Sequence, residues 1–183
     1  ATSALVLLVA FGDRHPAAAA PTCTKIWTGA EDDYWSTPAN WQPSGRPGQN
    51  DYACADESAD IYFDDDLVRT VKGLDIKGSL TIDYGELRIG LSSASGFEPS
   101  YVGDLRLADR RGGRAPLTIT GSLTVYSGGV LGSPDSATYA RYGTTTLAPG
   151  AELFLDDELS IEGRHTFRNE GRIDWLFGDV WVC

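Results

Sequence analysis

The sequence has few of the side chains that hold metals and cofactors: no methionine, two histidines and three cysteines among 183 residues. It contains no Cys-x-x-Cys pair, and His15 and His165 lie far apart, so zinc, the alternative use of the cysteines, has no clustered ligand set. Walker, Rossmann, His-Glu-x-x-His and Gly-x-Ser-x-Gly patterns are also missing. We therefore predict no metal site, no cofactor and no catalytic residues.

Basic residues are also scarce. Lys and Arg number 15 against 26 Asp and Glu, which gives a net charge of −11. A nucleic-acid partner requires a basic stripe, and none is visible, so we predict no such partner. A solvated acidic surface accounts for the charge, and cation binding is the alternative.

No apolar run is long enough to span a bilayer, which takes about 20 residues. The run "ALVLLVAFG" (Ala4–Gly12) precedes "DRHPAAAAP", and an apolar stretch followed by small residues is typical of a secretory signal. We assign residues 1–20 to a signal-like leader, with a buried helix as the alternative, and expect no transmembrane span in the mature chain. Because position 1 is not methionine, we expect a fragment or a trimmed chain.

Two cysteines, Cys23 and Cys54, bracket a tryptophan-rich segment. If they pair, they close a loop of about 30 residues, which is worth roughly 3–4 kcal/mol in the chain-entropy model. Such a bridge persists only in an oxidising compartment. We predict this disulfide and a secreted or cell-surface location, with Cys183 left over.

Glycine is abundant, with 21 residues, and it punctuates short apolar bursts. The stretches "LDIKGSLTI", "LTITGSLTV" and "LFLDDELSI" share apolar residues at their first, third, seventh and ninth positions. These positions are Leu74, Ile76, Leu80 and Ile82, then Leu117, Ile119, Leu123 and Val125, then Leu153, Leu155, Leu159 and Ile161. Strict alternation points one set of side chains to one face of a strand. Gly78 and Gly121 predict a bend that divides a stretch into two short strands.

The three copies are unequally spaced, which favours coils of a solenoid with loops of variable length between stacked strands. We predict an all-β fold, a right-handed parallel β-helix (β-solenoid), with residues 61–183 forming the coils. Leu74, Leu117 and Leu153 are then expected in register over one another. A β-sandwich is the alternative, because alternating strands with glycine turns suit it as well.

A separate pattern precedes these repeats: Trp27-Thr28-Gly29, Trp35-Ser36, Asn40-Trp41, Pro47-Gly48 and Asp51. It resembles the opening of β-solenoid repeat units in large secreted bacterial surface proteins, including autotransporter passenger regions. The resemblance covers about residues 25–60 well and the later strands loosely. It implies a parallel β-helix on the outside of a bacterial cell or released from it.

The same resemblance implies a non-enzymatic structural or adhesin-like module, and it brings no active site. We expect further coils of a longer chain beside it, and a surface glycan or a protein of a host or neighbouring cell as its partner. Two alternatives stay open: a carbohydrate-binding module, and a polysaccharide lyase or hydrolase on the flank of the β-helix.

We assign residues 21–60 to an N-terminal cap. A tryptophan buries on the order of 200 Å², so Trp27, Trp35 and Trp41 together can cover the open end of the first coil. The alternative is a glycan-binding platform made of the same three residues, because aromatic faces suit pyranose rings. That alternative requires the indoles to be exposed in a row.

Polar clusters supply the remaining candidates. Calcium favours carboxylate oxygens, but the two acidic clusters lack the spacing of a calcium loop, so we expect exposed strand-end carboxylates. A polysaccharide-degrading enzyme would use outward-facing groups with carboxylates about 5–10 Å apart. The acidic clusters are Asp64–Asp66 and Asp156–Glu158, and the enzyme candidates are Asp83, Glu86 and Arg88, or Asp104, Arg106 and Asp109–Arg111. His165 is expected to face solvent on a strand.

Overall fold

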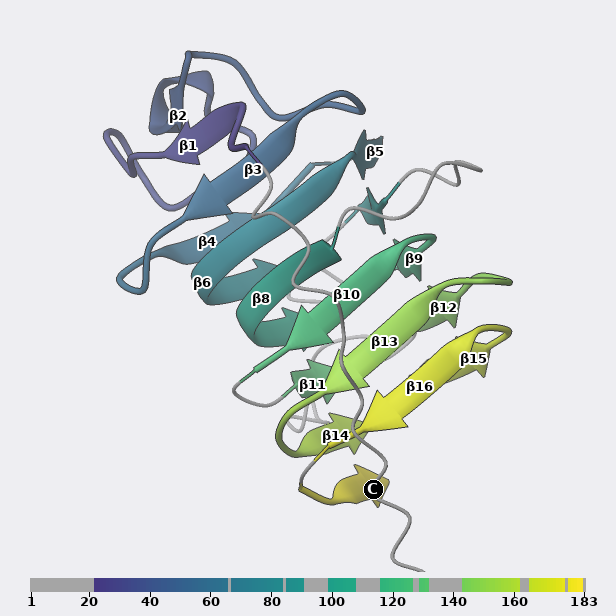
Figure 1. Ribbon diagram of the computed structural model, residues 1–183. Helices are drawn as coiled ribbons and strands as arrows, with labels where there is room; N and C mark the ends of the chain where they lie inside the picture. The colour runs from purple at the N-terminus through teal and green to yellow at the C-terminus, as the bar shows by residue number, and fades with distance from the viewer. Residues whose placement is uncertain are drawn as a thin grey trace, which may run out of the picture.

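The computed structural model describes residues 22–65, 67–83, 85–90, 99–107, 116–126, 129–131, 143–161, 165–176 and 178–182. The predicted leader at 1–20 lies outside these ranges. The described chain is nearly all strand, and its strands stack as parallel coils of a β-solenoid. Figure 1 shows the coils stacked one below another, from the cap at the top to the last strands at the bottom. The predicted fold class is therefore confirmed.

The strands are short because the chain turns a corner every few residues. The elements are β1 (Lys25–Trp27), η1 (Pro38–Asn40, a 3-10 helix), β2 (Trp41–Gln42), β3 (Tyr52–Ala55), β4 (Asp60–Phe63), β5 (Val68–Val71), β6 (Gly73–Ile82), β7 (Glu86–Ile89), β8 (Pro99–Leu107), β9 (Leu117–Ile119), β10 (Ser122–Val125), β11 (Gly129–Leu131), β12 (Thr144–Leu147), β13 (Glu152–Leu155), β14 (Leu159–Ile161), β15 (Thr166–Asn169), β16 (Arg172–Trp175) and β17 (Val180–Val182). The predicted boundary between cap and coils, after residue 60, falls within β4.

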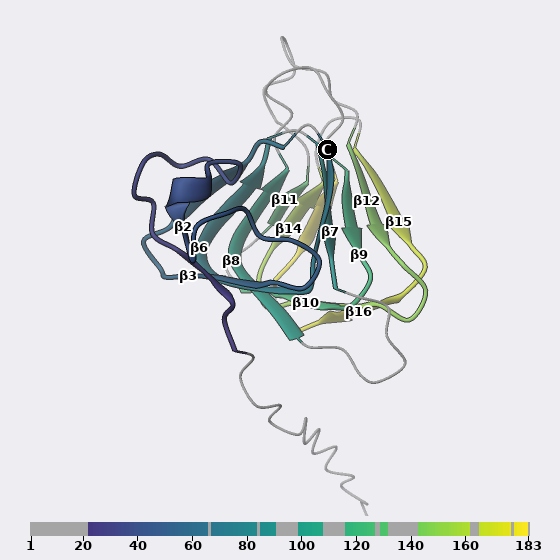
Figure 2. The ribbon, with the colours of Figure 1, turned by 90° about the horizontal axis from the view of Figure 1, so that it is seen from above.

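The described strands form three faces of the stack. The first face contains β3, the first half of β6, the first half of β8, β10, β13 and β16. The second contains β4, the second halves of β6 and β8, β11, β14 and β17. The third is the 5-stranded sheet β15-β12-β9-β7-β5. In Figure 2, β9, β12 and β15 lie on the opposite side of the stack from β11 and β14.

All described ladders are parallel except the pairing of β1 with β2. A β-sandwich is built from antiparallel sheets, so the sandwich alternative is wrong. Parallel pairing between successive coils places equivalent residues directly over one another. The inward-facing side chains therefore form continuous columns along the stack.

These inward columns make up the core. The first face supplies a buried column of aliphatic side chains, in which one polar residue is included: Ala53, Leu74, Ser100, Leu123 and Leu153. The hydroxyl of Ser100 is satisfied by the backbone, because it accepts a hydrogen bond from the N–H of Leu74 at 3.2 Å. Burying one large aliphatic side chain is worth roughly 1.5–3 kcal/mol. Each of these side chains is buried only because coils lie above and below it.

The register of the sequence repeats differs from the prediction. Leu117 lies on the third face, aligned with Leu87, whereas Leu74 and Leu153 lie on the first face. Leu153 is aligned with Leu123, so the first half of the third copy matches the second half of the second copy. The expectation that the three leading leucines lie over one another is wrong, although all three are buried in the same core.

The predicted bends at glycine are present. Gly121 separates β9 from β10, which belong to different faces. β6 runs through Gly78 without a break, but its first half pairs with β3 and its second half with β4. A Cβ at Gly78 would lie 2.1 Å from the carbonyl oxygen of Ala59. Glycine is therefore required there because the neighbouring coil approaches too closely for a side chain.

The two ends of the stack differ. At one end, β1 pairs with β3, and β2 pairs with β1, so a cap covers the first face of the first coil (Figure 1), whereas β5 on the third face pairs on one side only within the described chain. At the other end, β15, β16 and β17 each pair on one side only within the described chain. Large apolar side chains are exposed near that open edge, and they include Trp175, Leu176 and Trp181, the last at 53%.

We predict that Gly78→Ala destabilises the fold by about 1–3 kcal/mol, the usual cost of forcing extra atoms into a packed site. The measurement is the free energy of unfolding in urea. Gly48→Ala is the control, because a Cβ there meets its nearest atom, in the Asp51 side chain, at 3.7 Å. Equal effects of the two substitutions would contradict the close approach of the coils at Gly78.

Candidate functional site

One concave feature among the described residues is an open groove on the outer surface of the first face, with a volume of about 690 Å³. We call it the flank groove. Its floor is a column of outward side chains, one from each of four successive strands, namely Tyr101, Thr124, Phe154 and Asp174. Alternation along the strands fixes this arrangement, because most of their neighbours in sequence point into the core. At the last strand, Ile173 and Trp175 also line the groove, and Trp175 is exposed.

A second column borders the floor at the corner where each coil leaves the first face. It contains Tyr126, Asp156 and Leu176. Their backbone N–H groups donate to the carbonyl oxygens of Val102, Val125 and Leu155, respectively, which keeps the three residues stacked. Ser122 and Arg172 border the other side of the floor. The groove thus runs along the stack axis and crosses several coils.

Two tyrosines form the upper end of the groove. The rings of Tyr101 and Tyr126 are stacked, with centroids 5.8 Å apart and planes 15° from parallel. Tyr126 is nevertheless 50% exposed. Burial of its hydroxyl raises the pKa of Tyr126, and Tyr101, Asp156 and Asp75 add to this effect. The phenol therefore stays protonated at neutral pH and can donate a hydrogen bond.

The charges of the groove are mainly negative. The guanidinium of Arg172 binds Asp174 at 2.8 Å and lies 3.9 Å from Glu152. Its positive charge is therefore largely balanced by its neighbours. Asp156 adds a further carboxylate at the corner. The flank groove combines aromatic rings, hydroxyl groups and carboxylates, and it carries no excess of positive charge.

The predicted residues Trp27, Trp35 and Trp41 lie in the cap. Their rings pack edge to face, with Trp27 and Trp41 centroids 5.0 Å apart and Trp35 and Trp41 centroids 4.7 Å apart. Trp35 also contacts Phe63 of the first coil, at 5.7 Å. Trp35 and Trp41 are buried, and Trp27 is partly buried against them. The structure therefore places these indoles as a plug over the core, not in an exposed row.

One buried polar side chain organises the turn of the cap. Asn40 accepts hydrogen bonds from the backbone N–H groups of Glu31 and Asp32, and it donates to the carboxylate of Asp32 and the carbonyl of Tyr34. Trp41 Nε1 donates to the carbonyl oxygen of Trp35 at 3.0 Å. Among the described residues, Trp35 Nε1 is a buried side-chain nitrogen without a hydrogen-bond partner.

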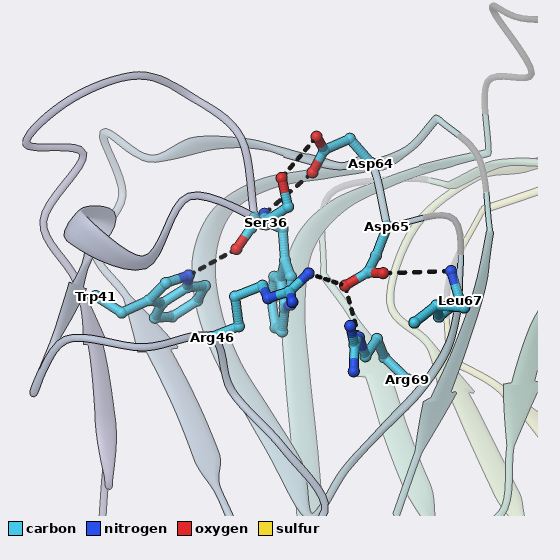
Figure 3. Close-up of polar contacts among 8 residues, drawn as sticks. Ser36, Trp41, Arg46, Asp64, Asp65, Leu67 and Arg69 are labelled. Carbon is cyan, nitrogen blue, oxygen red and sulfur yellow. Dashed lines mark hydrogen bonds and ion pairs between the residues drawn. The ribbon is translucent and has the colours of Figure 1, made fainter.

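Two adjacent aspartates connect the cap to the first coil (Figure 3). Asp64 accepts hydrogen bonds from the backbone N–H and the hydroxyl of Ser36, at 3.0 and 2.8 Å. Asp65 is buried and binds two arginines, Arg46 at 2.9 Å and Arg69 at 2.6 Å. Arg46 precedes Asp65 in the sequence and belongs to the cap loop, whereas Arg69 follows it and lies in β5. The two ion pairs therefore connect the cap loop to the start of β5.

The pKa of Asp65 reflects the same contacts. Burial alone would raise it, but the hydrogen bond from Arg69, the backbone N–H of Leu67 and the charges of both arginines outweigh burial and hold the pKa below its ordinary value. Asp65 is therefore ionised at neutral pH. Its contribution to stability is present above the pKa of an ordinary aspartate and is lost as the pH falls below it.

The predicted disulfide is confirmed. Cys23 and Cys54 are bonded, with Cα atoms 5.8 Å apart and a sequence separation of 31. Cys54 lies on β3, the first strand of the stack, so the bond fixes the start of the described chain to the first coil. Cys183 lies outside the described residues.

The acidic clusters do not form a metal site within the described ranges, where no three His, Cys, Asp or Glu side chains come close enough to hold an ion. Asp64 and Asp65 serve the cap, and Asp66 lies outside the described residues. Asp157 accepts the backbone N–H of Glu158. The expectation of exposed strand-end carboxylates is wrong for Asp65, because two arginines draw it into the protein.

The described residues that were considered for an enzyme lie on different faces of the stack: Glu86 and Arg88 on β7, and Asp104 and Arg106 on β8. Arg88 pairs with Glu86 at 2.7 Å, and Arg106 pairs with Asp104 at 2.6 Å. Asp83 is buried and not outward-facing as expected, and Asp109–Arg111 lie outside the described residues. Exposed pairs of this kind contribute little to stability.

His165 is half-buried and does not face solvent as predicted. It lies just before β15, and its Nε2 is 3.0 Å from the hydroxyl of Thr145, an inward-facing residue of β12. Burial lowers the pKa of His165 to about 4. The imidazole is therefore neutral at physiological pH.

Comparison of the chain with protein-family models, curated proteins and solved structures found no match. In the described part of the chain, no helix is long and apolar enough to cross a membrane. The geometry described above is therefore the basis for the functional proposals.

We predict that Asp65→Asn lowers the free energy of unfolding by about 1–3 kcal/mol, because two arginines lose their anionic partner. Chemical denaturation at pH 7 measures the change. Glu86→Gln is the matched control: its ion pair with Arg88 lies at the surface, so we expect a loss under about 1 kcal/mol. Similar losses in both variants would contradict a locking role for Asp65.

His165 generates a prediction on pH dependence. Its pKa is about 4 in the folded protein against an ordinary value of 6.5, so the unfolded chain takes up the proton first. Stability should therefore fall as the pH drops from 6.5 towards 4. His165→Gln should flatten this part of the unfolding curve, while the loss below about pH 4 that comes from Asp65 persists. An unchanged slope between pH 6.5 and 4 would contradict this assignment.

Proposed function

We propose that this protein is a non-enzymatic, extracellular β-solenoid module of structural or adhesin-like type. The observation that carries the proposal is the capped first strand of the stack, β3, to which the cap is joined covalently by the Cys23–Cys54 disulfide. A disulfide of this kind persists where the surroundings are oxidising, as they are outside the cell. Such a cap stabilises a stack, because it pairs with β3 and protects the edge of that strand from association.

The open edge at the other end supports the same proposal. Among the described residues, β15, β16 and β17 have no pairing partner on one side, and Trp175 and Trp181 are exposed beside them. A further coil placed there would continue each parallel ladder and cover these side chains. We propose that such coils, as part of a longer chain, are the neighbours of this edge in the assembled surface protein.

The experiment has a cellular part and a stability part. Disulfide mapping by mass spectrometry on protein from the producing cells should find Cys23 linked to Cys54 in the secreted or surface fraction. Replacing both cysteines with serine should lower the free energy of unfolding by about 3–4 kcal/mol. Reductant should lower the stability of the natural protein and leave that of the double variant unchanged.

Free thiols at both positions in protein from the cytosol would overturn the proposed extracellular role. Catalytic turnover of a polysaccharide by the purified chain would overturn its non-enzymatic character. Either result is independent of whether the flank groove binds a ligand.

A further inference from the structure

The upper part of the flank groove does not belong to the open edge of the stack. The lower end of the groove is lined by residues of β16, including Ile173 and Trp175, and a further coil would cover that end. The upper part holds the stacked pair Tyr101 and Tyr126, which lie on β8 and directly after β10. Both of these strands are paired on each side. A coil added beyond β16 therefore leaves the tyrosine pair at the surface.

Two carboxylates flank this tyrosine pair along the stack. Asp75 lies on β6 and is in register with Tyr101 on the next strand. Asp156 follows β13 and comes directly after Tyr126 in the corner column. Burial raises the pKa of Tyr126, and Tyr101, Asp156 and Asp75 raise it further. The phenol therefore lies within the electrostatic reach of both carboxylates.

No basic side chain of the described chain forms an ion pair with Asp75 or Asp156. Asp174, which lies in the same outward column as Asp75, does have such a partner, because Arg172 binds it at 2.8 Å. Both Asp75 and Asp156 are only partly buried. Their negative charges are thus accessible and uncompensated on either side of the tyrosine pair.

The chemistry of this site favours a cation. Tyr126 is 50% exposed, and the face of an aromatic ring attracts a positive charge, most often that of an arginine. A guanidinium is planar, so it stacks on a ring and also forms two parallel hydrogen bonds with a carboxylate. Lys77 follows Asp75 on β6, but its charge acts on Asp56 and lowers the pKa of that residue, after the larger effect of hydrogen bonds from Ser58. The net charge of −11 draws basic partners towards the protein.

The spacing of the two carboxylates determines the form of the ligand. From Asp75 on β6 to Asp156 after β13 there are three strand steps, through β8 and β10, which amount to roughly 14 Å along the stack. An extended peptide rises about 3.4 Å per residue, so two side chains four residues apart are also separated by roughly 14 Å and point the same way. The residue midway between them then faces the tyrosine pair. The hydroxyls of Thr124 and Tyr126 line the same path and can hydrogen-bond with its peptide groups.

From these observations we infer that the upper part of the flank groove binds an extended segment of a partner protein that carries two arginines four residues apart. Tyr126 is the stacking residue, and Asp75 and Asp156 are the carboxylates that receive the two arginines. The inference names a class of partner for the proposed adhesin-like role and rests on that role. It places the contact on the flank of the coils, away from the cap and from the open edge.

The test is calorimetric titration of the intact, oxidised chain with three peptides whose ends are blocked. The matching probe is Thr-Val-Arg-Thr-Val-Thr-Arg-Val-Thr. The second probe carries citrulline, a neutral analogue of similar shape, in place of both arginines. The third, Thr-Val-Thr-Arg-Arg-Thr-Val-Thr-Val, has the same composition but adjacent arginines, which point to opposite sides of an extended chain. The matching probe should bind about tenfold more tightly than the citrulline peptide and about threefold more tightly than the third.

Variants separate the site from the general charge of the protein. Tyr126→Ala should weaken binding of the matching probe about three- to tenfold, the effect of losing one cation–π contact. The double variant Asp75→Asn, Asp156→Asn should reduce the preference for arginine over citrulline to about threefold or less. The matched control is Asp33→Asn, Glu57→Gln, which changes the net charge equally at two exposed positions outside the groove and should keep the preference. The strand circular dichroism spectrum of each variant should match that of the natural protein, which separates loss of binding from loss of folding.

The inference is overturned if the matching probe does not bind, if the citrulline peptide or the peptide with adjacent arginines binds as tightly, or if Tyr126→Ala leaves the affinity unchanged. Equal losses in the two double variants would assign the binding to net charge alone and would also overturn it. So would binding of the neutral sugar cellohexaose in place of all three peptides. None of these outcomes changes the disulfide or the cellular location, so a failed site leaves the proposed extracellular module standing.

Discussion

The structure depends on the burial of aliphatic side chains between successive coils. No coil has enough residues to enclose its own inward side chains, so Leu80, Leu105 and their equivalents are buried only because a neighbour lies above and another below. Each contact of this type contributes a few kcal/mol at most, and the total grows with the number of coils. A stack built in this way always has two terminal coils whose side chains lack one neighbour.

The core is covered differently at the two terminal coils. At the first, three indoles, a disulfide and the Asp65 ion pairs cover and fasten the core. At the last, Ile173 and Phe167 are only partly buried and the strand edges are open within the described chain. The outward faces between these ends are free to vary without cost to the core, since alternation separates them from it. This freedom explains how one flank can hold aromatic and acidic residues in a groove.

The sequence was sufficient to predict the fold class and the disulfide, but not the alignment of the coils. Alternation distinguishes inward from outward residues, yet a short Leu-x-Leu segment fits any face equally well. The segment at Leu153 therefore matched Leu117 in sequence and Leu123 in space. The groove was missed for the same reason, because its floor takes one residue from each of four coils. With the register known, the alignment of Tyr101 and Phe154 on one outward face would have indicated the groove. Burial of Asp65 and His165 depends on tertiary neighbours that composition does not reveal.

The disulfide at Cys54 also determines the end from which the stack opens. Thermal fraying requires a coil to lose its neighbour on one side, and the coil fastened by the bond is the one least able to do so. Local unfolding should then start at β16 and β17 and proceed towards β3, the strand held by the disulfide. The amide protons of β3 would in that case exchange with solvent last, and those of the final strands first.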